Sequence, residues 1–253
     1  MTYKRKEQIG ECTLYLGDCL EIMPTLESVS HAIFDPPYED EIHDSIGKIR
    51  RNDGVKMIKS LGFSSINSIR QDVAKQAIAL SQGWLIAFCI AEGTKAWEVE
   101  IKKNGGKYDT TICWIKPDAM PRMNGQGSAR GFECAVTAWC GTGYRKWNAG
   151  GKRGVYTHCV NPSDRQGEHP TEKPVKLMAE ILTDFTNCGE TILDPFMGSG
   201  TTLVACAKLG RKGIGIEISE KYFDIACRRI KEAYRQPDLF VEPTRKALQE
   251  SLL

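Results

Sequence analysis

Two segments of this chain combine residue types that could carry chemistry, and the first is a turn with two glycines. Residues 194–202 read Asp-Pro-Phe-Met-Gly-Ser-Gly-Thr-Thr, and the acid Glu217 ends the next apolar segment. Glycines let a backbone approach a ligand closely, and an acid about 20 residues beyond such a turn can accept hydrogen bonds from ribose hydroxyls. Leu203 stands where a dinucleotide-binding turn has its third glycine. The turn therefore predicts a nucleoside ligand, with plain packing of a helix on a strand as the alternative.

The second segment is Asp35-Pro36-Pro37-Tyr38, which directly follows the apolar residues 31–34. Two consecutive prolines make the turn stiff and cannot donate hydrogen bonds, so the turn offers a carboxylate and a carbonyl as acceptors. Such a pair of acceptors suits a planar amino group whose ring stacks on Tyr38. The alternative is an ordinary strand-ending turn, where Asp and Pro are common. A chance match to this tetrapeptide has a probability on the order of one in a thousand in a chain of this length, which favours function.

With both segments present, the chain resembles the amino-methyltransferases of DNA, which transfer a methyl group from S-adenosylmethionine to the exocyclic amino group of adenine or cytosine. Residues 35–38 resemble the family's catalytic tetrapeptide, and residues 194–202 resemble its cofactor loop. Residues 169–174, His-Pro-Thr-Glu-Lys-Pro, resemble the helix-opening motif beside the methionine moiety of the cofactor, and residues 17–19, Gly-Asp-Cys, resemble the motif whose acid meets its adenine. A catalytic motif that precedes the cofactor loop is the order of the circularly permuted beta group.

This resemblance implies a set of site residues. The implied catalytic residues are Asp35, Pro36, Pro37 and Tyr38. The residues implied to bind S-adenosylmethionine are Asp18, Thr171, Lys173, Pro174, Asp194, Pro195, Phe196, Gly198, Ser199, Gly200, Thr201, Thr202 and Glu217. Hydrogen bonds from the target amine to Asp35 and to the Pro36 carbonyl would point the nitrogen lone pair at the methyl group, and Asp35 would stabilise the charge that develops there. A base in a duplex must be flipped out to reach such a site, where it would stack on Tyr38.

The identity of the target base stays open. Asp at position 35 favours adenine, because the cytosine enzymes of the family more often carry Ser there. Small-molecule and protein-glutamine methyltransferases place the cofactor loop first and carry Asn at this position, so they match less well. A catalytically silent nucleic-acid-binding module is a further alternative, although such a module would not need both the cofactor loop and an intact Asp35. Residues 39–44 depart from the family, because they are more acidic than we expect beside a DNA substrate.

The elements that must position these residues follow from the alternation of short apolar segments with amphipathic ones, which predicts an α/β fold. Strands are predicted at residues 13–16, 31–34, 84–90, 110–115, 191–194 and 213–217. Helices are predicted at residues 68–80, 92–103, 174–186, 200–209 and from 219 to about 235. Both motifs then follow strands at the carboxyl edge of a sheet, where such folds bind ligands. The predicted fold is a doubly wound, mostly parallel sheet of the S-adenosylmethionine-dependent methyltransferase type that the resemblance implies.

Basic residues are concentrated in the middle of the chain. Residues 102–153 hold ten Lys or Arg and three Asp or Glu, a net charge of +7 in a chain whose total is +2. Phe132, Trp139, Tyr144 and Trp147 lie among them, and such interleaving is typical of a nucleic-acid surface, where cations meet phosphates and rings stack on bases. The alternative is a solvated basic face with a few core aromatics. The predicted DNA-binding residues are Lys116, Arg122, Arg130, Arg145, Lys146, Lys152 and Arg153.

This pattern divides the chain into four predicted parts. Residues 1–116 are the catalytic half of a methyltransferase domain, and residues 117–168 are an inserted basic target-recognition region. Residues 169–235 are the cofactor-binding half of the same domain, and residues 236–253 are a loosely held tail. The predicted partner is double-stranded DNA, and the formation of a homodimer stays open.

The composition excludes several classes of protein. With 41% apolar and 26% charged residues, the chain matches a folded globular protein and excludes disorder, collagen and coiled coils. Its longest apolar run, residues 84–91, is far shorter than the ~20 residues of a membrane span, and no apolar signal core follows the charged N-terminus, so a cytoplasmic protein is predicted. The ten cysteines are scattered singly without a C-x-x-C pair, which predicts reduced core thiols and no metal site.

Overall fold

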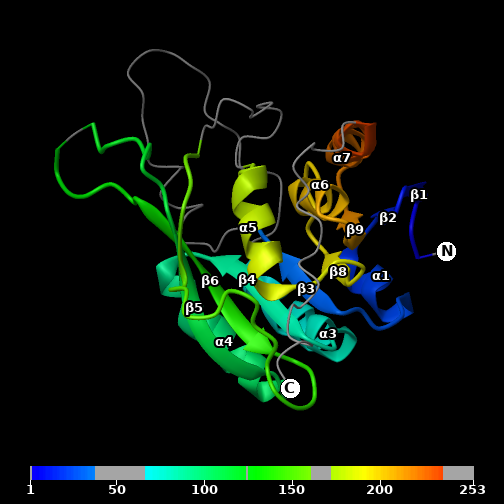
Figure 1. The fold of residues 1–253 in the computed structure, drawn as a ribbon, viewed down its shortest axis with the longest axis horizontal. Helices are drawn as coiled ribbons and strands as arrows, with labels where there is room; N and C mark the ends of the chain where they lie inside the picture. The colour runs from blue at the N-terminus through cyan, green and yellow to red at the C-terminus, as the bar shows by residue number, and fades with distance from the viewer. Residues whose placement is uncertain (1, 38–65, 124, 161–171, 236–253) are drawn as a thin grey trace, which may run out of the picture.

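The computed structural model describes residues 2–37, 66–123, 125–160 and 172–235, whose strands form one mixed sheet in the order β1-β2-β9-β8-β3-β4-β6-β5-β7 (Figure 1). The strands are β1 (Arg5–Ile9), β2 (Cys12–Leu16), β3 (His31–Phe34), β4 (Trp84–Cys89), β5 (Lys107–Ile115), β6 (Phe132–Trp139), β7 (Val155–Thr157), β8 (Thr191–Asp194) and β9 (Lys212–Glu217). The helices are α1 (Cys19–Ile22), α3 (Arg70–Leu80), α4 (Thr94–Lys103), α5 (Val175–Phe185), α6 (Thr201–Lys208) and α7 (Glu220–Arg235). Short 3-10 helices are η1 (Met23–Thr25), η2 (Ile66–Ser68) and η3 (Ala91–Gly93).

The middle of the sheet is parallel. β2, β9, β8, β3 and β4 pair in parallel, whereas β6 runs antiparallel to both β4 and β5. The chain passes from β8 to β9 in one direction across the sheet and from β3 to β4 in the other. β8 and β3 therefore flank the switch point at which open α/β sheets bind ligands. The predicted doubly wound, mostly parallel fold is confirmed.

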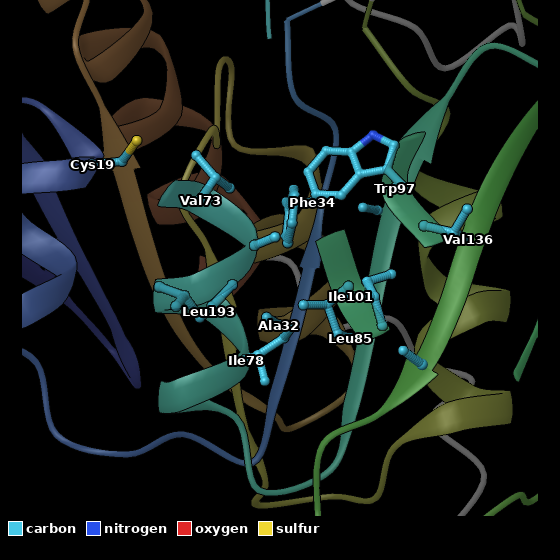
Figure 2. Close-up of a cluster of buried hydrophobic side chains, with 14 of the residues drawn as sticks. Cys19, Ala32, Phe34, Val73, Ile78, Leu85, Trp97, Ile101, Val136 and Leu193 are labelled. Atoms are coloured by element: carbon cyan, nitrogen blue, oxygen red, sulfur yellow. The ribbon is translucent and has the colours of Figure 1, made fainter. Parts of the chain in front are cut away.

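Helices cover both faces of this sheet. Figure 1 shows α3 and α4 on one side and α5, α6 and α7 on the other. In β3, Ala32 and Phe34 join the core under α3 and α4 (Figure 2), whereas Ile33 between them packs with α5. Successive side chains of a strand point to opposite faces, so a strand covered on both sides is buried at every position. This explains why β3 reads as a continuous buried run.

One core residue also fixes the turn that follows β3. Phe34 is fully buried and directly precedes Asp35. Its ring centroid lies 5.9 Å from that of Trp97 in α4 and 6.0 Å from that of Phe196, which follows β8. Burial of a side chain of this size stabilises the fold by ~1.5–3 kcal/mol. The strand end that carries Asp35 is therefore anchored in the core and contacts the segment after β8.

The structure contains three strands that the sequence pattern did not predict, namely β1, β6 and β7. In β1, exposed residues alternate with partly buried ones, the first three residues are charged, and the strand pairs antiparallel with β2 at the edge of the sheet. An edge strand buries little apolar surface, so its sequence lacks the apolar run used to predict the other strands. β7 is equally peripheral, since it pairs with β5 over three residues at the far edge.

β6 corrects the predicted division of the chain. Residues 117–168 are not an insertion along their whole length, because β6 lies between β4 and β5 and is buried from Glu133 onward. The polar residues Glu133 and Thr137 obscured this strand in the sequence. In the fold both are satisfied: the Thr137 hydroxyl donates to the carbonyl of Thr110 at 2.9 Å, and Glu133 forms ion pairs. Within the described part of this range β6 and β7 belong to the sheet, and the connections before and after β6 lie outside it.

The other predicted elements agree with the structure to within a few residues. β3 and β8 coincide with the predicted strands at 31–34 and 191–194, and β5 extends further toward the N-terminus than predicted. All ten cysteines are free thiols in the structure and six of them are buried, as expected for core thiols; their reduced state stays a prediction. No helix among the described residues has the length and apolar character of a membrane span. The tail at 236–253 lies outside the described residues.

Candidate active site

Four acidic residues lie at the edge of the sheet where its parallel strands end. Asp18 follows β2, Asp35 follows β3, Asp194 ends β8 and Glu217 ends β9. Because these strands are parallel neighbours, their carboxyl ends meet at one edge, which we call the carboxyl edge. The turn at Asp35 and the glycine loop, residues 194–202, therefore come together although they are far apart in sequence.

The two glycines of the glycine loop have different tasks. Both have positive φ, 51° at Gly198 and 84° at Gly200, a conformation that L side chains rarely adopt. A Cβ atom on Gly200 would lie 2.9 Å from Cβ of Ala226, so this glycine lets α7 pack against the loop. A Cβ atom on Gly198 would meet no described atom closer than the carbonyl oxygen of Phe196, at 4.0 Å. The backbone at Gly198 therefore has room for a ligand.

Glu217 holds the glycine loop from the neighbouring strand. Its Oε2 accepts the backbone N–H of Gly198 at 2.9 Å, and its Oε1 accepts that of Ser219 at 2.8 Å. Burial raises the pKa of Glu217, and these N–H groups oppose the rise. Each carboxylate oxygen has a second lone pair, so Glu217 can still accept hydrogen bonds from hydroxyl groups while it holds the glycine loop.

Asp194 links the glycine loop to the turn at Asp35. Its Oδ1 accepts the backbone N–H of Phe196 at 3.0 Å, and its side chain is almost fully buried. Burial raises the pKa of Asp194 to about 7 against hydrogen bonds from Thr202 and Phe196, and the charges of Asp35 and Glu217 add to the rise. Because β8 lies between β9 and β3 in the sheet, Asp194 lies between Glu217 and Asp35.

Arg229 of α7 is a buried clamp that sequence reasoning missed. Its Nη1 donates to the carbonyl oxygen of Ser199 at 2.8 Å, to Ser199 Oγ at 2.7 Å and to Thr201 Oγ1 at 3.3 Å. Its Nη2 forms an ion pair with Glu172, which precedes α5. The side chains of Ser199 and Thr201 therefore face α7 and shape the loop. The sequence contained a signal for this residue, because Arg229 is the one cation that falls on the apolar, buried face of the amphipathic helix α7.

Lys173 has a partner that sequence reasoning did not predict. Its Nζ lies 2.6 Å from Asp35 Oδ2 and 3.0 Å from Glu133 Oε2, and it lies over the ring of Phe88 at 5.1 Å. Glu133 forms a second ion pair with Lys116. The lysine expected to bind the cofactor thus contacts the carboxylate expected to bind the substrate.

The charges around Asp35 oppose one another. Burial raises the pKa of Asp35, Lys173 and Lys116 lower it, and Glu133 raises it further, with a net rise. Burial also acts to raise the pKa of Glu133, but the two lysines outweigh it and the net pKa is lowered. Glu133 is therefore the firmly ionised member of this group, whereas the ionisation of Asp35 depends on Lys173.

The remaining predicted site residues divide into three groups. Asp18 caps α1, since its Oδ1 accepts the backbone N–H of Leu20 at 2.8 Å. Pro174 occupies the cap position of α5, with its carbonyl accepting the N–H of Met178. The buried residues are Pro36, Pro174, Pro195, Ser199, Gly200, Thr201 and Thr202, and Pro37 and Phe196 are partly buried. Tyr38 and Thr171 lie outside the described residues.

The predicted DNA-binding residues lie in two connections, which start at opposite edges of the sheet. The connection between β5 and β6, residues 116–131, starts at the carboxyl edge, because Cys89 at the end of β4 pairs with Cys134 near the start of β6. Within this connection Arg122 and Arg130 are exposed, and Arg130 lies 3.4 Å from Glu92. Lys116 is mostly buried in its ion pair with Glu133.

The connection between β6 and β7, residues 140–154, starts at the other edge, which we call the amino edge, because Trp139 pairs with the first residue of β4 (Figure 1). Here Arg145 forms an ion pair with Asp109, and Lys146 and Arg153 are exposed. Lys152 is held by Glu180 and Asp184 of α5. The basic window is therefore not one surface.

The aromatic residues of the basic window divide in the same way. Trp139 packs on Trp84 with ring centroids 5.3 Å apart, and Trp147 packs on Phe185 at 4.8 Å, so both belong to the core. Phe132 and Tyr144 are exposed, Tyr144 almost completely. Among the described residues, no group of three or more His, Cys, Asp or Glu side chains could hold a metal ion.

Comparisons with known proteins agree with this geometry. A family described as DNA methylase, of the N6/N4 methyltransferase type, matches residues 29–228. The type II methyltransferase M.HinfI of Haemophilus influenzae is 25% identical over 265 residues, which cover 92% of this chain and 72% of that protein. The type II methyltransferase M2.DpnII of Streptococcus pneumoniae is 48% identical over 65 residues, which cover 26% of this chain and 24% of that protein.

Two solved structures resemble the fold over most of its length. The crystal structure of an M1.HpyAVI–SAM complex has a TM-score of 0.69 and 26% identity, and it covers 87% of this chain and 98% of its own. The PvuII DNA methyltransferase, named as cytosine-N4-specific, has a TM-score of 0.71 and covers 92% of this chain and 95% of its own. At 16% identity the second likeness shows the fold alone.

Proposed function

This chain belongs to the N6/N4 DNA methylase family, and we propose that it transfers a methyl group from S-adenosylmethionine to the exocyclic amino group of adenine in DNA. The observation that carries the proposal is the meeting of Asp35 with the glycine loop at the switch point of the sheet. Amino-group methylation needs an acceptor for the amine and a nucleoside site for the donor within reach of each other. The carboxyl edge offers both.

Three features of the carboxyl edge suit S-adenosylmethionine. Gly198 leaves space beside the backbone, and Glu217 retains lone pairs that could accept the two ribose hydroxyls. Oε2 of Glu172 is buried and has no hydrogen-bond partner among the described residues, although Oε1 pairs with Arg229. A buried carboxylate oxygen of this kind suits a cation such as the α-ammonium group of the methionine moiety. The bound donor supplies an activated methyl group on a sulfonium.

The chain's own contribution to the reaction would be orientation and charge. Lys173 occupies Oδ2 of Asp35, which leaves Oδ1 to accept one N–H of the target amine. The Pro36 carbonyl could accept the other, because the two residues are adjacent and the prolines keep the turn stiff. The amine nitrogen gains positive charge as it bonds to carbon, and the carboxylate of Asp35 stabilises that charge. No metal is needed for these steps.

Double-stranded DNA is the proposed substrate, and the cytoplasm is the proposed compartment. The connection between β5 and β6 supports a DNA substrate, since it presents Arg122 and Arg130 at the edge that carries Asp35. A base in a duplex would have to be flipped to reach Asp35. Cytosine is the second candidate base, because the PvuII enzyme with the same fold is named as specific for cytosine N4.

A nucleoside analysis tests the proposed function. We would incubate the purified protein with duplex DNA and methyl-labelled S-adenosylmethionine, digest the DNA and separate the nucleosides by mass spectrometry. N6-methyl-2'-deoxyadenosine is the expected product, and the Asp35→Asn variant is the control for a contaminating activity. N4-methyl-2'-deoxycytidine alone would establish the second candidate. Cofactor binding without any methylated nucleoside would contradict the proposal and favour a silent binding module.

A further inference from the structure

Four alternating charges lead from the end of β5 to the turn at Asp35. Lys116 at the end of β5 pairs with Glu133 Oε1, Glu133 Oε2 lies 3.0 Å from Lys173, and Lys173 lies 2.6 Å from Asp35 Oδ2. The four residues come from four separate parts of the chain. Only the tertiary fold brings them together, so the alternation of charges is a property of the folded site and not of a local sequence motif.

The two inner charges are almost withdrawn from water. The side chain of Lys173 is 5% exposed and that of Glu133 is 10% exposed. Aromatic rings cover the cation, since Phe88 and Trp114 have ring centroids 5.1 Å and 5.9 Å from Lys173 Nζ. A buried ammonium group is costly unless charges and ring faces compensate it. Glu133 supplies a counter-charge for Lys173 in addition to that of Asp35.

Fixing Lys173 has a consequence for the reacting group. A lysine side chain has many rotamers, and it must give up much of this freedom to be held in one contact. Held between Glu133 and the two rings, Lys173 has already lost this freedom. Its ammonium can then hold one oxygen of Asp35 at a fixed place, and the other oxygen keeps a defined direction.

Among the described residues, the charged groups with the largest effects on the pKa of Asp35 are the other three members of this arrangement. Lys173 precedes α5, Lys116 directly follows β5 and Glu133 lies in β6, and Asp194, which borders them, ends β8. The two lysines lower the pKa of Asp35 against burial, whereas Glu133 raises it. Glu133 therefore does not help Asp35 to ionise by its direct effect. Its presence needs a different explanation, which its contact with Lys173 provides.

We propose that Glu133 is a positioning residue, which holds the ammonium of Lys173 on Oδ2 of Asp35 so that Oδ1 is free and correctly aimed for the target amine. Lys116 supports it by pairing with its other oxygen. This inference rests on the proposed amino-methyl transfer and names a residue that the two sequence motifs do not contain. Glu133 itself touches neither donor nor acceptor.

The first test measures chemistry and cofactor binding separately. In Glu133→Gln we expect the single-turnover rate constant to fall roughly tenfold to hundredfold, since a misplaced reacting group costs rate. The dissociation constant for S-adenosylmethionine should stay within about twofold, because Glu133 lies outside the nucleoside site. Glu133→Asp, which retains the charge, should recover part of the rate. A wild-type rate in Glu133→Gln, or equal rates in both variants below wild type, would overturn the proposal.

A second test needs no methylation activity. Acetic anhydride labels accessible amines, and mass spectrometry gives the labelling rate of each lysine. Lys173 should react slowly in the wild-type protein and several-fold faster in Glu133→Gln. The matched control is Glu98→Gln, because Glu98 is also flanked by two lysines, Lys95 and Lys102, but lies on α4. Unchanged labelling of Lys173 in Glu133→Gln would overturn the inference even if the wild-type protein methylates DNA. Faster labelling in a protein without methylation activity would reject the proposed function alone.

Discussion

Charged residues at the two edges of the sheet serve different purposes. At the carboxyl edge some acceptor atoms are kept unsatisfied: Oε2 of Glu172 has no hydrogen-bond partner among the described residues, and Asp35 is 29% exposed. At the amino edge the charges satisfy one another. Asp184 accepts the hydroxyl of Tyr156 at 2.8 Å and pairs with Lys152, and His31 lies 2.8 Å from Glu190. Similar residue types leave acceptor atoms available in one place and hold the fold in the other.

The difference teaches that composition cannot locate a surface. The basic window appears uniform in sequence, but β6 carries the chain from the carboxyl edge to the amino edge in the middle of it. Arg122 and Arg130 therefore lie in the connection that starts at the carboxyl edge, where Asp35 lies. Arg145 and Lys146 lie a whole strand away. At about 3.3 Å per residue, the eight residues of β6 separate the two connections by roughly 25 Å.

The largest contrast in methylation rate is expected between variants of Asp35 at the carboxyl edge and of Asp184 at the amino edge. Asp35→Asn should lower the methylation rate at least about a hundredfold, because the charge that develops on the amine loses its counter-charge. Its affinity for S-adenosylmethionine should change only a few-fold, since Asp35 acts on the acceptor. Single-turnover assays and calorimetry measure the two quantities.

The amino-edge counterpart is Asp184→Asn, which removes a charge from a buried pair with Lys152. It should lower the melting temperature and leave the methylation rate of the folded protein unchanged. A variant at Asp35 that retains more than about a tenth of the wild-type rate would break the contrast and remove Asp35 from the chemistry.

Two buried arginines give the next contrast. Arg229→Met leaves Glu172 without its partner, and breaking a buried ion pair typically costs 3–5 kcal/mol of the free energy of unfolding, as an order of magnitude. It should also weaken S-adenosylmethionine binding about tenfold, because the freed glycine loop must be ordered again on binding.

Arg211 is the matched control near the amino edge. Its guanidinium donates to neutral acceptors, such as the carbonyls of Thr186 and Leu209 at 2.9 Å and 2.7 Å. Arg211→Met should destabilise the fold through these lost hydrogen bonds while cofactor affinity stays at the wild-type value. Chemical denaturation measures the stability of both variants, and calorimetry measures their affinity for S-adenosylmethionine. Equal loss of affinity in the two variants would show that the effect of Arg229→Met is general destabilisation.

A smaller contrast concerns the two halves of the basic window. Each phosphate contact adds about 0.9 to the slope of log affinity against log salt concentration. Replacing Arg122 and Arg130 together with Ala should flatten that slope by up to about two units. Replacing Arg145 and Lys146 should change it little, since these two residues lie at the amino edge. Filter binding over a range of salt concentrations measures both, and the reverse order would place the DNA at the amino edge.

Much of the fold could be predicted from sequence because its central strands are buried on both faces. The continuous apolar runs of β3, β4 and β8 have no other stable place in a soluble domain, so their positions followed directly. Both motifs could be assigned to the carboxyl edge for the same reason. β6 was missed because Glu133 interrupts its pattern, and the burial of that acid depends on its ion pairs with Lys116 and Lys173, of which Lys173 is distant in sequence.

The candidate site was predictable to the extent that it is local. The Asp35 turn and the glycine loop are contiguous segments, so their residue types reveal them. The contacts of Lys173 with Asp35 and of Arg229 with Ser199 join residues that are far apart, and no spacing rule encodes them. The resemblance implied that Lys173 contacts the cofactor. That role stays a prediction beside its observed ion pair with Asp35.

The smallest expected effect is a pH dependence that separates stability from activity. His31, at the start of β3, accepts the backbone N–H of Trp84 through Nδ1 at 2.9 Å, so its proton is on Nε2 and faces Glu190. Burial lowers the pKa of His31 against the effect of Glu190. An unfolded histidine titrates near about 6.5, so below that pH the unfolded chain binds more protons than the folded one. Stability should therefore be full above that pH and decline as the pH falls toward the folded value.

The slope expected from one proton is at most about 1.4 kcal/mol per pH unit in the free energy of unfolding. Urea unfolding between pH 7.5 and 5.5, values chosen to bracket the titration of about 6.5 in an unfolded chain, should show the decline in the wild-type protein and lose part of it in His31→Gln. The methylation rate of folded molecules should follow the same pH profile in both proteins, because His31 lies at the amino edge and the reaction depends on Asp35. A variant with an unchanged stability slope would assign the titration to another group. A variant with a shifted rate profile would show that the two edges are coupled, and the separation of roles between them would then be wrong.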